Sequence, residues 1–182
     1  MRRSLVFAVA LLVSASFAAD AHARTLDRIV AIAGDHVILL SEVQLRAKPY
    51  VALAASQEKD PLALARLTSK ALRETCERLI DEALVEDEAK RQHLVVTDDE
   101  VDKAIAQVAA NNNLTLDALY AEAAKQGYDA ATYHAEISHT IIEWKLVQIR
   151  TRTSDEKVLE GARKDMLVEL RSKAYVEDRL TP

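Results

Sequence analysis

The sequence predicts a mainly α-helical fold with a small β element. Apolar residues recur at helical spacing over most of the chain, and only three glycines and three prolines interrupt it. Near the N-terminus, two apolar, β-branched runs flank Gly34 and Asp35, which predicts two strands joined by a tight turn. We therefore expect a β-hairpin followed by helices, all within one domain.

Residues 1–23 have the pattern of a secretory signal peptide. Arg2 and Arg3 form a basic start, residues 4–17 are apolar but too few for a comfortable membrane span, and Ala21 and Ala23 fit the small-residue cleavage site. We expect cleavage after Ala23, which leaves a mature domain of residues 24–182 without a membrane span. An uncleaved membrane anchor is the alternative.

The mature chain is mildly acidic. It keeps 22 basic and 28 acidic residues, a formal charge of −6, and the two kinds are interspersed, so nothing predicts nucleic-acid binding. Cys76 is the only cysteine, which excludes an intramolecular disulfide. Its place on an apolar helical face predicts a buried, unreactive thiol.

Two helices should follow the hairpin. Ser41 is a good N-cap, so the first helix should start there and be interrupted or bent at Pro49. Asp60 before Pro61 predicts the start of the second helix, which should run to about Gln92.

Three further helices are marked by caps. Thr97 and Glu100 have the spacing of a capping box, Thr115 and Asp129 are N-caps, and Gly127 suits a left-handed helix end. We expect the inner face of the helix after Thr115 to carry Leu116, Leu119, Tyr120 and Ala123. We expect the helix from Asp129 to Arg150 to carry Tyr133, Ile137, Ile141 and Trp144.

The chain ends with one more predicted helix and a short strand. Residues 151–155 are a polar break before the helix, and residues 174–177 can extend into a strand. We expect this strand to pair with the N-terminal hairpin, because the apolar strands would otherwise expose their edges.

Several segments, in this order, resemble the N-terminal region of the SurA-like periplasmic chaperones. They are the hairpin at residues 26–42, the segments 79–84 and 89–90, 94–102, 111–116 and 126–128, and the closing segment 170–177. The resemblance implies the helical SurA N-terminal domain fold, a C-terminal segment that packs back on it, and a periplasmic location in a Gram-negative bacterium.

The chain departs from this family at one place. SurA-like proteins usually carry one or two parvulin prolyl-isomerase domains between the long helix and the C-terminal segment, each of roughly a hundred residues. Here only about residues 151–159 separate the two parts. The chain therefore resembles the chaperone module with the isomerase left out.

The residues predict no enzyme and no cofactor. Four histidines follow the signal, His36, His93, His134 and His139, and the last two lie five positions apart, which places them on different helical faces. No zinc-binding motif, nucleophile elbow, phosphate loop or dinucleotide fingerprint is present. The acidic runs at residues 86–88 and 98–100 suit a solvated helix face and a helix start.

Apolar and aromatic side chains are the candidates for binding an extended peptide. The six candidates are Leu116, Leu119, Tyr120, Tyr128, Tyr133 and Trp144. Tyrosine and tryptophan offer a large apolar area with a polar tip, which suits a groove that accepts many sequences, although filling the core between helices is the commoner role of such aromatic residues.

The function implied by the resemblance is that of an ATP-independent holdase that binds unfolded outer-membrane proteins or peptides. The alternative is a non-catalytic envelope assembly or scaffold protein, acting as a homodimer or as a subunit of a larger complex.

Overall fold

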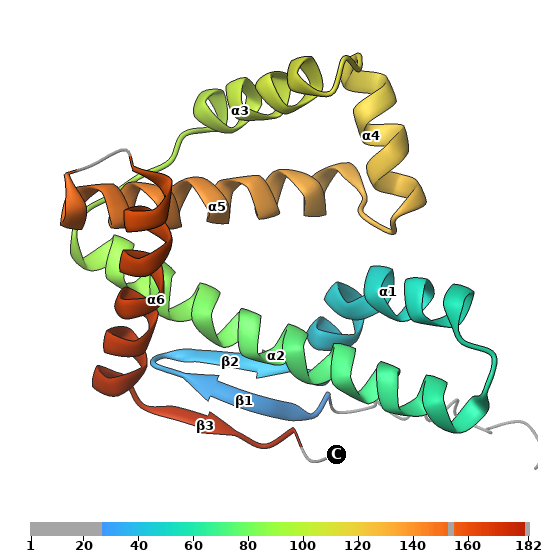
Figure 1. Cartoon of the computed structure of the whole chain (residues 1–182). Coiled ribbons are helices and arrows are strands. Elements are labelled where there is room, and N and C mark those ends of the chain that lie inside the picture. Colours follow the sequence, from blue (N-terminus) through green and yellow to red (C-terminus); the bar gives the residue numbers. More distant parts are fainter. Residues whose placement is uncertain (1–26, 153–154, 181–182) are drawn as a thin grey trace, which may run out of the picture.

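A computed structural model describes residues 27–152 and 155–180, and the predicted signal with its cleavage site at Ala21 and Ala23 lies outside them. The elements are, in chain order, β1 (Ile29–Ala33), β2 (His36–Leu39), α1 (Leu40–Gln57), α2 (Pro61–Arg91), α3 (Asp98–Asn111), α4 (Leu116–Lys125), α5 (Ala130–Thr151), α6 (Glu156–Lys173) and β3 (Val176–Asp178). The fold is mainly α with one small sheet, which confirms the predicted class (Figure 1).

The sheet joins the N-terminal and C-terminal parts of the domain. Its strand order is β2-β1-β3, and both pairings are antiparallel. At the ends of β3, the Gly34 amide donates to the Tyr175 carbonyl at 2.8 Å and the Arg179 amide donates to the Val30 carbonyl at 2.7 Å. The predicted pairing of the C-terminal strand with the hairpin is confirmed.

The hairpin turn needs a glycine. Gly34 has φ of +58°, a left-handed conformation that other residues adopt at a cost. A Cβ at this position would also lie 2.7 Å from the Asp87 carboxylate. The turn residue therefore fixes both the hairpin and its approach to α2.

The prediction that Ser41 caps α1 was wrong. The helix already begins at Leu40, so Ser41 lies in its first turn. The upstream Asp27 carboxylate accepts hydrogen bonds from the Ser41 hydroxyl and, at 3.3 Å, from its amide. The pKa of Asp27 is lowered, and the hydrogen bond from the Ser41 hydroxyl is the largest cause. A side chain that precedes β1 thus provides a hydrogen-bond acceptor for an amide in the first turn of α1.

Pro49 does not interrupt α1, which continues to Gln57. The next helix, α2, starts as predicted, because the Asp60 side chain accepts from the Ala63 amide and Pro61 takes the first position. It is the longest helix, and its inner face carries much of the main core. Cys76 lies in this core with 1% exposure, and burial raises the pKa of its thiol to about 11.

The main core joins the sheet, the first turns of α1, α2, the C-terminal part of α5 and α6. Its most deeply buried residues include Val30, Ile80, Leu146 and Met166. We call this part, together with α1, the body.

A second, separate cluster holds together α3, α4 and the N-terminal part of α5. We call these three elements together the arm (Figure 1). Val101, Ile105, Ala109 and Leu119 are its buried residues. The capping box at its start is confirmed, since the Thr97 amide donates to Glu100 at 3.0 Å and the Glu100 amide donates to Thr97 at 3.3 Å.

Leu116, predicted on an inner helix face, lies outward, and so does Trp144, predicted as part of the apolar set of its helix. Leu116 is the first residue of α4 and is 47% exposed, and Trp144 on α5 is 51% exposed. Helical spacing identifies a shared face, but it does not say whether another element covers every position along that face.

The remaining connections are short. Only residues 152–155 separate α5 from α6, so no further domain stands between these helices. Among the described residues, no helix is both long and apolar enough to cross a membrane.

Candidate functional site

Two cavities along α5 form the candidate site. The first, of about 330 Å³, lies between α4 and α5, and we call it the arm cavity. The second, of about 490 Å³, lies between α2, α5 and α6, and we call it the junction cavity. Glu136 on α5 lines both, so the two cavities are neighbours along one helix.

The arm cavity gathers half of the predicted peptide-binding residues. Leu119, Tyr128 and Tyr133 line it, together with Glu122, Ala123, Gln126 and Glu136. Gly127, with φ of +90°, ends α4 as predicted and turns the chain so that Tyr128 faces this space. The cavity is therefore built by the short turn between two capped helices.

The other three candidates lie elsewhere. Tyr120 packs edge-to-face on Tyr133, with ring centroids 6.0 Å apart and planes at 81°, and so supports the cavity wall from within the arm. Leu116 and Trp144 are not among the residues that line either cavity.

Tyrosines connect the arm cavity to α1. The Tyr128 hydroxyl lies 3.3 Å from that of Tyr50, and burial together with this hydrogen bond raises the pKa of Tyr128 to about 12. Arg78 of α2 donates to the Tyr50 hydroxyl at 2.6 Å, and its guanidinium lies 5.2 Å from the Tyr50 ring centroid. The cation–π contact holds the Arg78 guanidinium over the Tyr50 ring.

A buried ionic cluster lies beside these tyrosines. Arg46 of α1 contacts Glu82 of α2 at 3.0 Å and Glu136 of α5 at 2.5 Å, and the three side chains are 11%, 16% and 24% exposed. The pKa of Glu82 is raised, because burial penalises its charged form more than Arg46 favours it. One arginine thus joins three helices.

Hydrogen bonding in this cluster is incomplete. Among the described residues, five buried atoms make no hydrogen bond of acceptable geometry. Three of them still lie in ion pairs: Glu136 Oε1 with Arg46 at 2.5 Å, His139 Nδ1 with Glu86 at 3.2 Å and Arg78 Nε with Glu82 at 3.5 Å. The other two are Arg46 Nε and Arg78 Nη2. Buried polar atoms without such bonds cost free energy. The contact between arm and body is therefore held by charges that are only partly satisfied.

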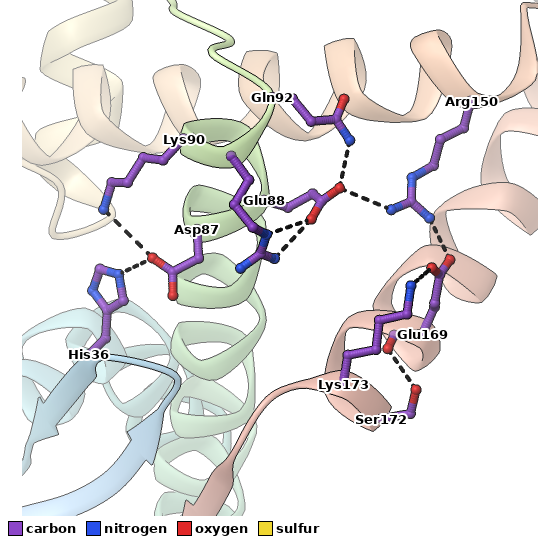
Figure 2. A network of polar contacts seen from close by, with 10 residues as sticks. His36, Asp87, Glu88, Lys90, Gln92, Arg150, Glu169, Ser172 and Lys173 are labelled. Atoms are coloured by element: carbon purple, nitrogen blue, oxygen red, sulfur yellow. Dashed lines mark hydrogen bonds and ion pairs between the residues drawn. The ribbon is translucent and has the colours of Figure 1, made fainter.

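The opposite end of α5 is fastened differently. Arg150 contacts Glu169 of α6 at 2.6 Å and Glu88 of α2 at 3.5 Å, and Figure 2 shows both carboxylates sharing further partners. Arg91 and Gln92 bind Glu88, and Lys173 binds Glu169. Hydrogen bonds from Lys173 and Arg150 lower the pKa of Glu169. The body end of α5 is anchored by a connected network over the main core.

Three of the four histidines in the described part of the chain pair with carboxylates of other elements. His36 lies 2.9 Å from Asp87, as Figure 2 shows, His139 lies 3.2 Å from Glu86, and His134 lies 3.7 Å from Asp102. No group of three metal-ligating side chains occurs among the described residues. Chemically, the site offers apolar and aromatic walls beside charged groups, which suits the binding of a peptide.

Sequence reasoning missed the ionic cluster. Arg46 and Glu82 lie 36 positions apart, and neither stands in a motif. Arg78 and Glu82 have the helical spacing of an ordinary surface ion pair, which gives no indication of burial.

Comparison with known proteins agrees with this architecture. The SurA N-terminal domain matches residues 26–147 of this chain.

The chain belongs to the SurA N-terminal domain family.

The matched region covers the hairpin, the arm and most of α5, whereas α6 and β3 lie beyond it and complete the body.

Several relatives carry the name Chaperone SurA. The one from Pectobacterium atrosepticum is 29% identical over 137 residues, which cover 74% of this chain and 30% of the relative. Those from Salmonella choleraesuis and Shigella flexneri are each 28% identical over 143 residues, covering 77% of this chain and 31% of the relative. The chain thus spans less than a third of the length of these relatives.

Proposed function

We propose that this SurA N-terminal domain protein is an ATP-independent periplasmic chaperone that holds unfolded outer-membrane proteins. Its relatives are named Chaperone SurA, and the first 23 residues have the pattern of an export signal. The observation that carries the proposal is the arm cavity, where Leu119, Tyr128 and Tyr133 surround an open space.

The physical basis is shielding of apolar side chains. An unfolded strand of a membrane barrel exposes alternating apolar residues to water. A cavity of about 330 Å³ can take one or two such side chains, and its aromatic walls supply apolar area without demanding a fixed sequence. Because the cavity makes few polar contacts with the client, the client can also be released.

We further propose that the protein acts without prolyl-isomerase activity. Only residues 152–155 separate α5 from α6, where the usual isomerase domains of SurA-like proteins would stand. A protease-coupled assay on a prolyl peptide tests this directly, and turnover above the uncatalysed rate would refute it.

The holdase activity can be tested by light scattering. Residues 24–182 are added while a urea-unfolded outer-membrane barrel protein is diluted into buffer. We expect aggregation to be suppressed near stoichiometric ratios. No suppression at any reachable ratio would refute the proposal.

Two matched tyrosine variants locate the activity. Tyr128→Ala removes a wall of the arm cavity, whereas Tyr175→Ala removes a side chain that is 64% exposed and lies next to β3. We expect only the first to weaken suppression. Equal effects of both variants would contradict the assignment of the cavity.

A scaffold role is the second candidate, and exposed leucines favour it. Leu53 near the end of α1 is 55% exposed, and Leu62 and Leu67 on the first turns of α2 are 62% and 40% exposed. A homodimer could bury these side chains. Sedimentation equilibrium tests this, since a dimer dispersed by Leu62→Glu would support the scaffold role and a monomer would exclude a homodimeric scaffold.

A further inference from the structure

The arm and the body are separate packing units. The arm has its own cluster around Ile105, and the main core lies around Ile80 and Leu146. The two units share α5, whose C-terminal part carries Leu146 and Val147 into the main core. Motion of the arm about this end of α5 would therefore leave both clusters intact.

Three contacts connect the free end of the arm to α1. Arg46 pairs with Glu136, the Tyr50 hydroxyl approaches that of Tyr128, and Pro49 packs against the turn at Gly127. A Cβ at Gly127 would lie 3.5 Å from the Pro49 ring, so the turn fits closely over the proline. We call these contacts the latch. In Figure 1 they lie where α1 faces the corner between α4 and α5.

The latch is the weaker of the two attachments of α5. It consists of one ion pair, one tyrosine contact and the packing of Pro49, and no cluster of buried apolar residues includes both α1 and the arm. At the other end of α5, Arg150 belongs to a connected network that overlies the main core (Figure 2). Opening at the latch therefore costs less than detachment at Arg150.

The latch also lies on the wall of the candidate site. Glu136 lines both cavities, and Tyr128 lines the arm cavity. Breaking the contact between Arg46 and Glu136 would free one side of each cavity, so the same motion changes the space open to a bound segment.

We propose that the latch between Arg46 and Glu136 regulates access to the client site by holding the arm against the body. The choice of an unfolded protein as the ligand rests on the proposed chaperone function, whereas the motion of the arm does not depend on it. A released latch widens the space between α1 and the arm, and a bound unfolded segment stabilises the open arrangement because it contacts surface that the closed one covers.

The test compares two arginines that each bridge two carboxylates. Arg46→Gln removes the latch pair, and Arg150→Gln is the matched control at the anchored end of α5. Spin labels at Gln57 on α1 and Lys125 on α4, in a Cys76→Ala background, report the distance between body and arm without any client. Circular dichroism checks that each variant is folded, and Glu136→Gln serves as a second latch variant should Arg46→Gln unfold.

We expect Arg46→Gln to shift the distance distribution to longer values and Arg150→Gln to leave it unchanged. We also expect Arg46→Gln to tighten binding of an unfolded barrel protein by roughly 5-fold or more, the usual lower range for a conformational coupling. An unchanged distribution in both latch variants, or an equal shift in the control, would overturn the proposal. Failure of the wild-type chain to bind any barrel protein would instead refute the chaperone function and leave the distance result standing.

Discussion

Replacing Ile105 by alanine tests whether the arm has a core of its own. Ile105 is 1% exposed and lies at the centre of the arm cluster. The change removes three carbons, worth about 2.4 kcal/mol at about 0.8 kcal/mol per buried methylene. The cavity left behind places the total cost at about 2–5 kcal/mol.

We expect Ile105→Ala to destabilise the arm and not the body. Hydrogen exchange measured by mass spectrometry should become faster in α3 and α4 by about 30-fold or more, since each 1.36 kcal/mol is about a factor of ten. Exchange in β1 and α2 should stay as it is in the wild type, because those elements pack in the main core.

The matched control is Ile80→Ala, which makes the same chemical change at a residue that is also 1% exposed but lies in the main core. It should accelerate exchange in β1 and α2. If Ile105→Ala accelerated exchange in β1 and α2 as much as in α3, the domain would be one cooperative unit and the reasoning from two clusters would be refuted.

Three further predictions concern the body. Deleting residues 174–182 removes β3 and the apolar contacts of Val176 and Leu180. The free energy of unfolding should fall by about 2 kcal/mol, which should lower Tm by about 4–8 °C. An unchanged thermal unfolding curve would contradict the three-stranded sheet. Gly34→Ala should cost about 1–3 kcal/mol in urea unfolding, because φ is +58° and the new Cβ meets Asp87, whereas Gly161→Ala, with nothing within 4 Å, should not destabilise. Burial raises the pKa of Glu82 above 4.5, so its contribution to stability is present below pH 4.5 and is lost as the pH rises through the raised value. In urea titrations the wild type should therefore lose stability relative to Glu82→Gln as the pH rises through that window, and a difference that moves the other way would show that ion pairing outweighs burial.

The local elements could be predicted because their signals are local. Thr97, Thr115 and Asp129 cap helices as expected, and each does so with an amide only three residues away. The position of Gly127 at a helix end follows from its freedom to adopt positive φ. Such interactions are encoded within one turn of chain, so a single sequence displays them.

Contacts between distant residues could not be predicted in the same way. Ser41 has the right chemistry for an N-cap, yet Asp27, 14 positions upstream, binds it and the helix starts one residue earlier. Trp144 has the correct helical period but is 51% exposed, because periodicity does not tell which part of a long helix is covered.

The candidate site shows the same division. Three of the six candidate residues line the arm cavity, because they belong to two successive helices and the predictable turn that joins them. The charged cluster that Arg46 forms with Glu82 and Glu136 depends on how α1 packs against α2 and α5, and no spacing in the sequence encodes that packing. Whether these residues bind clients stays a prediction.

The central claim is that the arm cavity contacts unfolded clients, and site-specific photo-crosslinking tests it most directly. p-Benzoylphenylalanine replaces Gln126, an exposed residue that lines the arm cavity, or Lys164, an exposed residue on α6 that lines neither cavity. Each variant of residues 24–182 is irradiated with a urea-diluted barrel protein. We predict covalent adducts from position 126 and few or none from position 164. Equal yields at both positions, or adducts only from position 164, would contradict the account.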